Sequence, residues 1–104
     1  MPNKSKAKGN RFEYQVRDAF KNNGIECKRA YGSDGRSLGY QENVDLVAFH
    51  GIHYTIQCKV RKSISKFIKP ASNIFAQIIK EDRGETICAI RLQDLIKLMK
   101  RSSP

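Results

Sequence analysis

A single acidic residue stands in the most basic part of this chain. Asp45 is the only Asp or Glu between residues 43 and 80, a span that also holds six lysines and arginines. It lies in a short apolar segment, and Gln57, Cys58 and Lys59 follow in the next one. Carboxylate, amide and carbonyl oxygens are the ligands that a hard divalent cation prefers, and a nearby ammonium group can orient a water or neutralise a phosphate. These residues therefore predict metal-assisted cleavage of a phosphodiester bond, with the Cys58 backbone carbonyl as a further ligand.

A hairpin around Gly51 would position these groups. Residues 44–49 and 53–60 alternate as two strands, and Gln57 and Lys59 share one face of the second strand. If the hairpin turns at Gly51 with a three-residue loop, Phe49 pairs with His53 and Asp45 lies opposite Gln57. Directly opposed Cβ atoms are about 5 Å apart, and Lys59 would lie on the diagonal. A register shift of one residue would separate the groups.

A predicted first helix supplies a second carboxylate. It runs from Asn10 to Asn22 or Asn23, is stopped by Gly24, and carries an apolar stripe of Phe12, Val16, Ala19 and Phe20. Glu13 lies on the flank of that stripe, about 100° from Phe12, where it can reach a metal directly or through water.

Each of these residues has a structural alternative. Asp45 could be an ion-pair partner of Lys59 on an exposed strand face, and Gln57 could simply face solvent on an alternating strand. Glu13 could pair with Arg17 one helical turn away. Ser33 could be a turn residue in the glycine-rich loop of residues 32–41.

The remaining segments complete an α/β pattern. Residues 25–31 favour a first strand, and residues 61–69 form a basic connector. Pro70 can open a second helix with an apolar stripe of Ile74, Phe75, Ile78 and Ile79. Residues 85–91 favour a fourth strand, and a terminal helix follows, with Leu92, Leu95, Ile96 and Met99 on its apolar side. We expect residues 1–9 to be a flexible basic arm and residues 10–104 to be a single domain with a mixed central β-sheet flanked by helices.

Composition limits the class of protein. The 104 residues are enough for one domain, and twenty Lys and Arg against ten Asp and Glu give a formal charge of +10. Such a field attracts polyanions, above all nucleic acid. The three scattered cysteines favour neither a disulfide framework nor a zinc site. With no apolar run of membrane-spanning length and no signal peptide at the basic amino terminus, we expect a cytoplasmic protein, encoded by a cell, a virus or a phage.

Four short motifs, taken together, resemble a known family. They are Gly9-Asn10-Arg11-Phe12-Glu13, Arg29-Ala30-Tyr31-Gly32-Ser33, Val44-Asp45-Leu46-Val47 and Ile56-Gln57-Cys58-Lys59. In this order and spacing, over roughly residues 8–91, the chain resembles the PD-(D/E)xK nuclease superfamily and looks most like the archaeal-type Holliday junction resolvases. The resemblance implies a restriction-endonuclease-like fold and a Mg²⁺-dependent endodeoxyribonuclease, with Mn²⁺ as a substitute.

The resemblance also assigns roles to single residues. It implies that Glu13, Asp45 and Gln57 bind the metal, that Lys59 is the catalytic lysine, and that Ser33 helps to position the junction strand. The family usually has Glu or Asp where this chain has Gln57, and the amide keeps an oxygen ligand but removes a negative charge. Val44 stands where the family motif has proline, with no obvious chemical consequence.

The resemblance implies a partner and an assembly as well. Family members act as twofold homodimers that cut two strands of a four-way junction symmetrically and leave 5′-phosphates. Exposed apolar side chains such as Phe75 or Met99 are candidate dimer contacts. Nine basic residues are candidate contacts to the DNA backbone: Lys4, Lys6, Lys8, Arg11, Arg29, Arg36, Arg61, Lys62 and Lys66. The alternatives are a nuclease that acts on ends, flaps or duplex DNA, and a non-catalytic DNA-binding module of the same fold.

Overall fold

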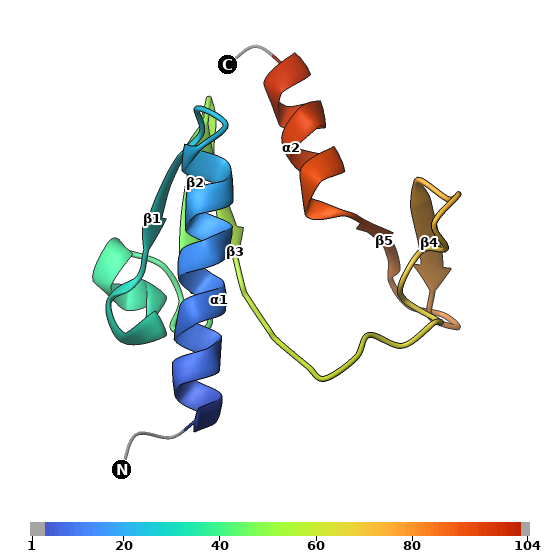
Figure 1. The fold of residues 1–104 in the computed structure, drawn as a ribbon, viewed down its shortest axis with the longest axis horizontal. Coiled ribbons are helices and arrows are strands. Elements are labelled where there is room, and N and C mark those ends of the chain that lie inside the picture. The colour runs from blue at the N-terminus through green and yellow to red at the C-terminus, as the bar shows by residue number, and fades with distance from the viewer. Residues whose placement is uncertain (1–3, 103–104) are drawn as a thin grey trace. The chain divides into compact units, whose positions relative to one another are not determined.

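The computed structural model describes residues 4–102. These residues divide after Val60 into two compact units, of which the second spans Arg61–Ser102. Figure 1 shows the elements of both units. The residues of the two predicted strand segments and of the first predicted helix all lie in the first unit.

The first unit is a helix packed on a small antiparallel sheet (Figure 1). Helix α1 spans Lys4–Lys21, and the sheet has the strand order β1 (Glu26–Arg29), β2 (Leu46–His50) and β3 (Ile52–Ile56). Burial of apolar side chains from both layers stabilises the unit. The most deeply buried large side chains are Phe20, Ile25 and Leu46.

Helix α1 begins earlier than expected. The sequence pattern predicted a start at Asn10 after a flexible arm, but residues from Lys4 onward are helical. Lysine and alanine are good helix formers, and together they outweigh the single unfavourable glycine at Gly9. The end is as predicted, because the chain turns at residues 22–24 and Gly24 adopts a φ of +78°, which favours glycine. Residues 1–3 of the expected arm lie outside the described part of the chain, and the division into an arm and a single domain stays a prediction.

The predicted hairpin and its register are confirmed, but the second strand ends at Ile56 rather than at Val60, so Gln57 and Lys59 lie beyond it. Strands β2 and β3 pair so that Phe49 lies opposite His53 and Leu46 opposite Ile56. Gly51 makes the turn with a φ of +82°. One further step along the same register brings Asp45 opposite Gln57, just beyond the regular ladder, and the Asp45 backbone N–H still donates to the Ile56 carbonyl at 2.9 Å.

The second unit differs from the prediction at one element. The helix expected after Pro70 is instead strand β4 (Ala76–Lys80), paired antiparallel with β5 (Thr86–Ile90). The apolar stripe that predicted a helix contains β-branched isoleucines, which also fit a strand. Strand β5, a few residues later in the chain, pairs with that strand. Strand β5 and the terminal helix α2 (Leu92–Arg101) agree with the prediction. Within α2, Ile96 and Met99 are buried.

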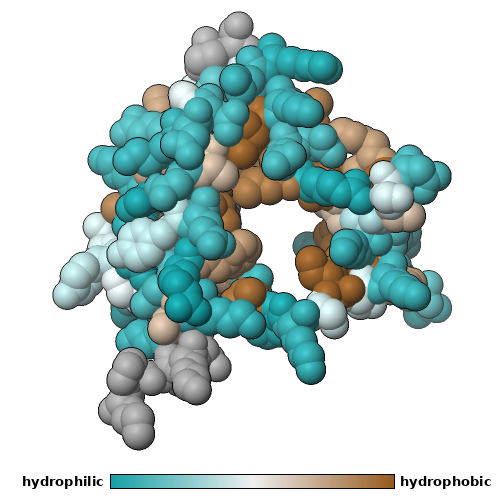
Figure 2. Space-filling model, viewed as in Figure 1, coloured by the Kyte–Doolittle hydropathy of each residue, from teal (hydrophilic) through white to brown (hydrophobic). Residues whose placement is uncertain are grey.

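The structure therefore confirms an α/β fold compatible with the resolvase-like class. In residues 4–102 the strands form two antiparallel sheets rather than one mixed central sheet. Of the two candidate dimer contacts, Phe75 is exposed but precedes a strand, whereas Met99 is buried and so is not the exposed side chain that was expected. Within the described residues, no helix is long and apolar enough to cross a membrane. Hydrophilic side chains cover most of the face drawn in Figure 2, as the high net charge requires.

Candidate active site

Asp45 is a buried carboxylate held by the neighbouring strand. Only 8 % of the residue is exposed, and its Oδ2 accepts a hydrogen bond of 2.7 Å from the Cys58 backbone N–H. The burial contradicts the alternative in which Asp45 pairs with Lys59 on an exposed face. Within the described residues, no salt bridge joins Asp45 to Lys59. A buried carboxylate beside a strand end is suited to bind a cation.

Glu13 is also buried, on the side of α1 that faces the sheet. The residue is 6 % exposed, and its Oε1 accepts a hydrogen bond of 2.9 Å from Arg29 Nε at the end of β1. Arg29 Nη2 also donates to Asn10 Oδ1 at 3.0 Å. Arg17, the alternative partner of Glu13, forms an ion pair with its neighbour Asp18. Glu13 is thus fixed by a strand rather than by its own helix.

The end of β1 connects the Glu13 carboxylate to the backbone of Asp45. The Arg29 side chain binds Glu13, and the backbone N–H of the next residue, Ala30, donates to the Asp45 carbonyl at 2.8 Å. Burial raises the pKa of the Cys58 thiol to about 12, and the charges of Asp45 and Glu13 add to this effect. The Cys58 backbone N–H is also the donor to the Asp45 carboxylate, so Asp45 lies next to this residue, and the grouping of Glu13, Asp45 and Cys58 in one metal site stays a prediction.

Gln57 and Lys59 lie on the chain just after β3, and both are exposed. Gln57 lines a shallow cleft of about 260 Å³ together with Asn43 and Val44, the residues that lead into Asp45. Within the described residues, no group of three or more His, Cys, Asp or Glu could hold a metal. The amide Gln57 supplies no carboxylate to such a group, and its place in a metal site stays a prediction.

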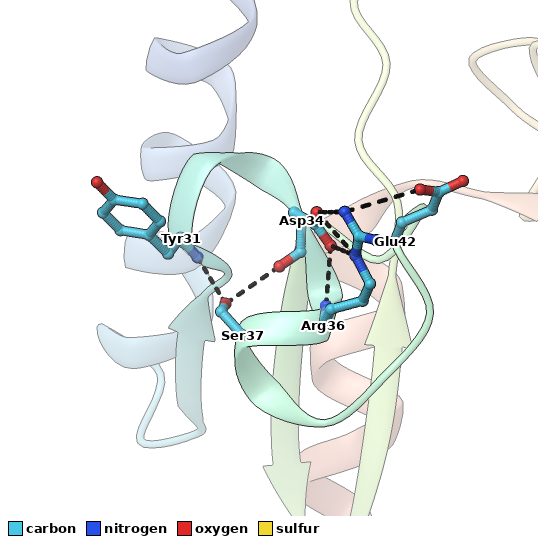
Figure 3. Close-up of polar contacts among 5 residues, drawn as sticks. All are labelled: Tyr31, Asp34, Arg36, Ser37 and Glu42. Carbon is cyan, nitrogen blue, oxygen red and sulfur yellow. Dashed lines mark hydrogen bonds and ion pairs between the residues drawn. The ribbon is translucent and has the colours of Figure 1, made fainter.

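The loop after β1 forms two 3₁₀ turns, Tyr31–Ser33 and Gly35–Leu38. Ser33 ends the first turn, and its side chain lies outside the described part of the structure. Asp34 caps the second turn, because its Oδ1 accepts from the Arg36 N–H at 3.0 Å (Figure 3). Hydrogen bonds from Arg36 hold the pKa of Asp34 below its ordinary value. The loop that carries Ser33 is therefore ordered by a local ion pair.

The candidate DNA contacts fall into different environments. Lys6, Lys8 and Arg11 are exposed along α1, whereas Arg36 is exposed but bound to Asp34. Arg29 is half-buried against Glu13, with its side chain 16 % exposed, so its first role is to position that carboxylate. Arg61, Lys62 and Lys66 are exposed in the second unit, and the side chain of Lys4 is not described. No residue type or spacing in the sequence links Arg29 to Glu13, since they are sixteen positions apart.

Comparison with known proteins identifies the family of the chain. No curated protein and no solved structure matches the chain significantly. The family model described as archaeal Holliday junction resolvase matches residues 4–103. This match covers both buried carboxylates, the hairpin and the loop with Ser33. The chain therefore belongs to the family of archaeal Holliday junction resolvases, and it is a resolvase-like nuclease.

Proposed function

We propose that this protein is a divalent-metal-dependent endonuclease that cuts branched DNA, with the four-way junction as its preferred substrate. The observation that carries the proposal is the pair of buried carboxylates: Asp45 accepts from the Cys58 N–H just after the hairpin, and Glu13 accepts from Arg29 at the end of β1. Family membership supplies the substrate class. The charge of +10 supports capture of a polyanion.

Asp45, Glu13, Gln57 and the Cys58 carbonyl would hold the cation, which we propose to be Mg²⁺, with Mn²⁺ as a substitute. The donors are all oxygen atoms, and two of them are carboxylates, which fits a hard cation. When bound, such a cation would act as a Lewis acid that lowers the pKa of a coordinated water and stabilises charge on the phosphate.

The chain's own residues then have distinct tasks. Arg29 fixes the orientation of Glu13, and the Cys58 N–H fixes that of Asp45. Lys59, exposed beside the site, neutralises charge on the phosphate or orients the attacking water. We propose that Ser33 helps to position the strand to be cut.

We further propose that two copies of the chain act together. The strands of a four-way junction are equivalent in pairs, and a twofold dimer would present one site to each strand of a pair. Sedimentation of the protein alone and with a junction checks this, and a single copy per junction at saturation would contradict it.

The decisive experiment is Asp45→Asn. Asparagine keeps an oxygen that can accept from the Cys58 N–H but loses the charge, so we expect cleavage of a labelled four-way junction to fall by about a hundredfold or more. Binding of the junction should stay normal or tighten, because a charge that repels phosphate is gone. Asp82→Asn, in an exposed turn, is the matched control and should cut normally.

The same assay separates the alternatives. The wild-type protein should cut the junction with Mg²⁺ and not with a chelator. Equal cutting of linear duplex would overturn the junction preference. Binding without cleavage of any DNA would favour the non-catalytic module. In that case the amide at Gln57 would have abolished metal binding.

A further inference from the structure

A groove beside the candidate active site gathers cations and aromatic rings. It has a volume of about 450 Å³ and is lined by residues of α1, of β1 and of the turn after β1. Among the described residues, no carboxylate lines it. Its charged and aromatic lining residues are Tyr14, Arg17, Lys21, Lys28, Arg29 and Tyr31.

The arginines of the groove are held in place by a tyrosine. The guanidinium carbons of Arg17 and Arg29 each lie 4.8 Å from the centre of the Tyr14 ring. Cation–π contacts of this kind fix the direction of the positive charge. Asp18 pairs with Arg17 from outside the lining and offsets part of its charge.

The two lysines extend the positive surface. Lys21 ends α1 and Lys28 lies on β1, and both are exposed. Cys27 of β1 is buried, which raises the pKa of its thiol to about 11 against the charges of Arg17 and Lys21. Lys28 also lines a second cleft together with Glu26. The cations of α1 and β1 that line the groove are Arg17, Lys21, Lys28 and Arg29.

Tyr31 adds an exposed ring. It is 86 % exposed, and its backbone N–H donates to Ser37 Oγ at 2.9 Å, which anchors the turn beneath it. Figure 3 shows the ring pointing away from the pair of Asp34 and Arg36. Cations that follow a backbone, together with aromatic rings that stack on bases, are the features of a site for an unpaired strand.

We propose that this groove binds an unpaired DNA strand, with phosphates at Arg17, Lys21 and Lys28 and one base stacked on Tyr31. Arg29 belongs to the groove and also binds Glu13, so the bound strand leads toward the candidate active site. The inference rests on the proposed function, because it names how that site receives its DNA.

The test compares two double variants of equal charge. The first variant combines Lys21→Gln and Lys28→Gln, which removes one lysine on a helix and one on a strand of the groove. The control combines Lys80→Gln and Lys97→Gln, which removes one strand lysine and one helix lysine of the second unit. The affinity for a labelled thymidine oligonucleotide is measured at several salt concentrations with chelator present, after circular dichroism has shown each variant folded. Each lost phosphate contact should lower the magnitude of the slope of log affinity against log salt by about 0.7. We therefore expect a decrease of about 1.4 for the variant with both groove lysines replaced and no change for the control variant. Equal slopes for the two variants would overturn the proposal that the groove binds DNA.

Tyr31 is tested separately. Tyr31→Ala should weaken binding of the oligonucleotide by about tenfold, and Tyr31→Phe should leave it unchanged, because the stacking face is kept. If Tyr31→Ala binds the oligonucleotide with wild-type affinity, the proposal that a base stacks on Tyr31 is wrong. Because binding is measured without metal, this test does not depend on cleavage. A protein that binds through the groove but cuts no DNA when Mg²⁺ is supplied would refute the proposed function and leave this inference standing.

Discussion

At the scale of the residue, Gln57 carries an amide where the resemblance to the nuclease family leads us to expect a carboxylate. An amide in place of a carboxylate supplies an oxygen but no charge, so the proposed site has two anionic ligands rather than three. Because the oxygen ligand is kept, we expect a weaker affinity for the metal rather than a different reaction.

Gln57→Glu tests this reading. We expect the variant to reach half-maximal cleavage at about tenfold less Mg²⁺, which corresponds to about 1.4 kcal/mol of binding free energy. Gln15→Glu, the same change on an exposed position of α1, should not shift the Mg²⁺ dependence. An unchanged Mg²⁺ titration for Gln57→Glu would remove this residue from the metal site.

Glu13 and Arg29 form the other decisive residue contact. Both side chains are largely buried, at 8 % and 16 % exposed. Glu13→Ala leaves a buried guanidinium without its carboxylate, so we expect the free energy of unfolding to fall by about 3 kcal/mol in urea denaturation. Asp18→Ala breaks the more exposed pair with Arg17 and should cost less than about 1 kcal/mol. Similar losses for the two variants would mean that burial does not strengthen the Glu13 contact.

At the scale of the element, two glycines report on helix α1 and on the hairpin. Gly9 lies inside α1 with open space where a Cβ would be, so Gly9→Ala should stabilise the protein by about 0.5 to 1 kcal/mol. Gly51 turns the hairpin with a φ of +82°, so Gly51→Ala should destabilise it by about 1 to 2 kcal/mol. Thermal unfolding measures both. No gain from Gly9→Ala would indicate that residues 4–9 are the flexible arm that the sequence first predicted.

At the scale of the whole molecule, the net charge of +10 should dominate DNA affinity. If six or more phosphates are contacted, affinity for a junction should fall by about a thousandfold or more between about 50 and about 200 mM salt. Fluorescence anisotropy with chelator measures this dependence. A shallow salt dependence would mean that the excess charge serves solubility and not DNA capture.

Local signals predicted most of the elements. The apolar stripe around Val16 and Phe20, the turn at Gly24 and the alternation around Gly51 each occur within a few residues, and each element formed as expected apart from the start of α1. The segment after Pro70 was predicted wrongly, because its isoleucines satisfy both a helical stripe and a strand. The partner strand Thr86–Ile90 decided between them, and such pairing is a tertiary effect.

The sequence by itself determined the residue types of the candidate site, the basic character of the chain, its match to a nuclease family and the hairpin register that sets Asp45 opposite Gln57. These follow from residue types and short-range periodicity. Only the tertiary structure decided that Glu13 and Asp45 are buried and tied together through Arg29 and Ala30, and that Arg17, Lys21 and Lys28 converge on one groove. Contacts between residues far apart in the chain depend on how helix and sheet pack, because packing chooses which faces meet, and no local pattern records that choice.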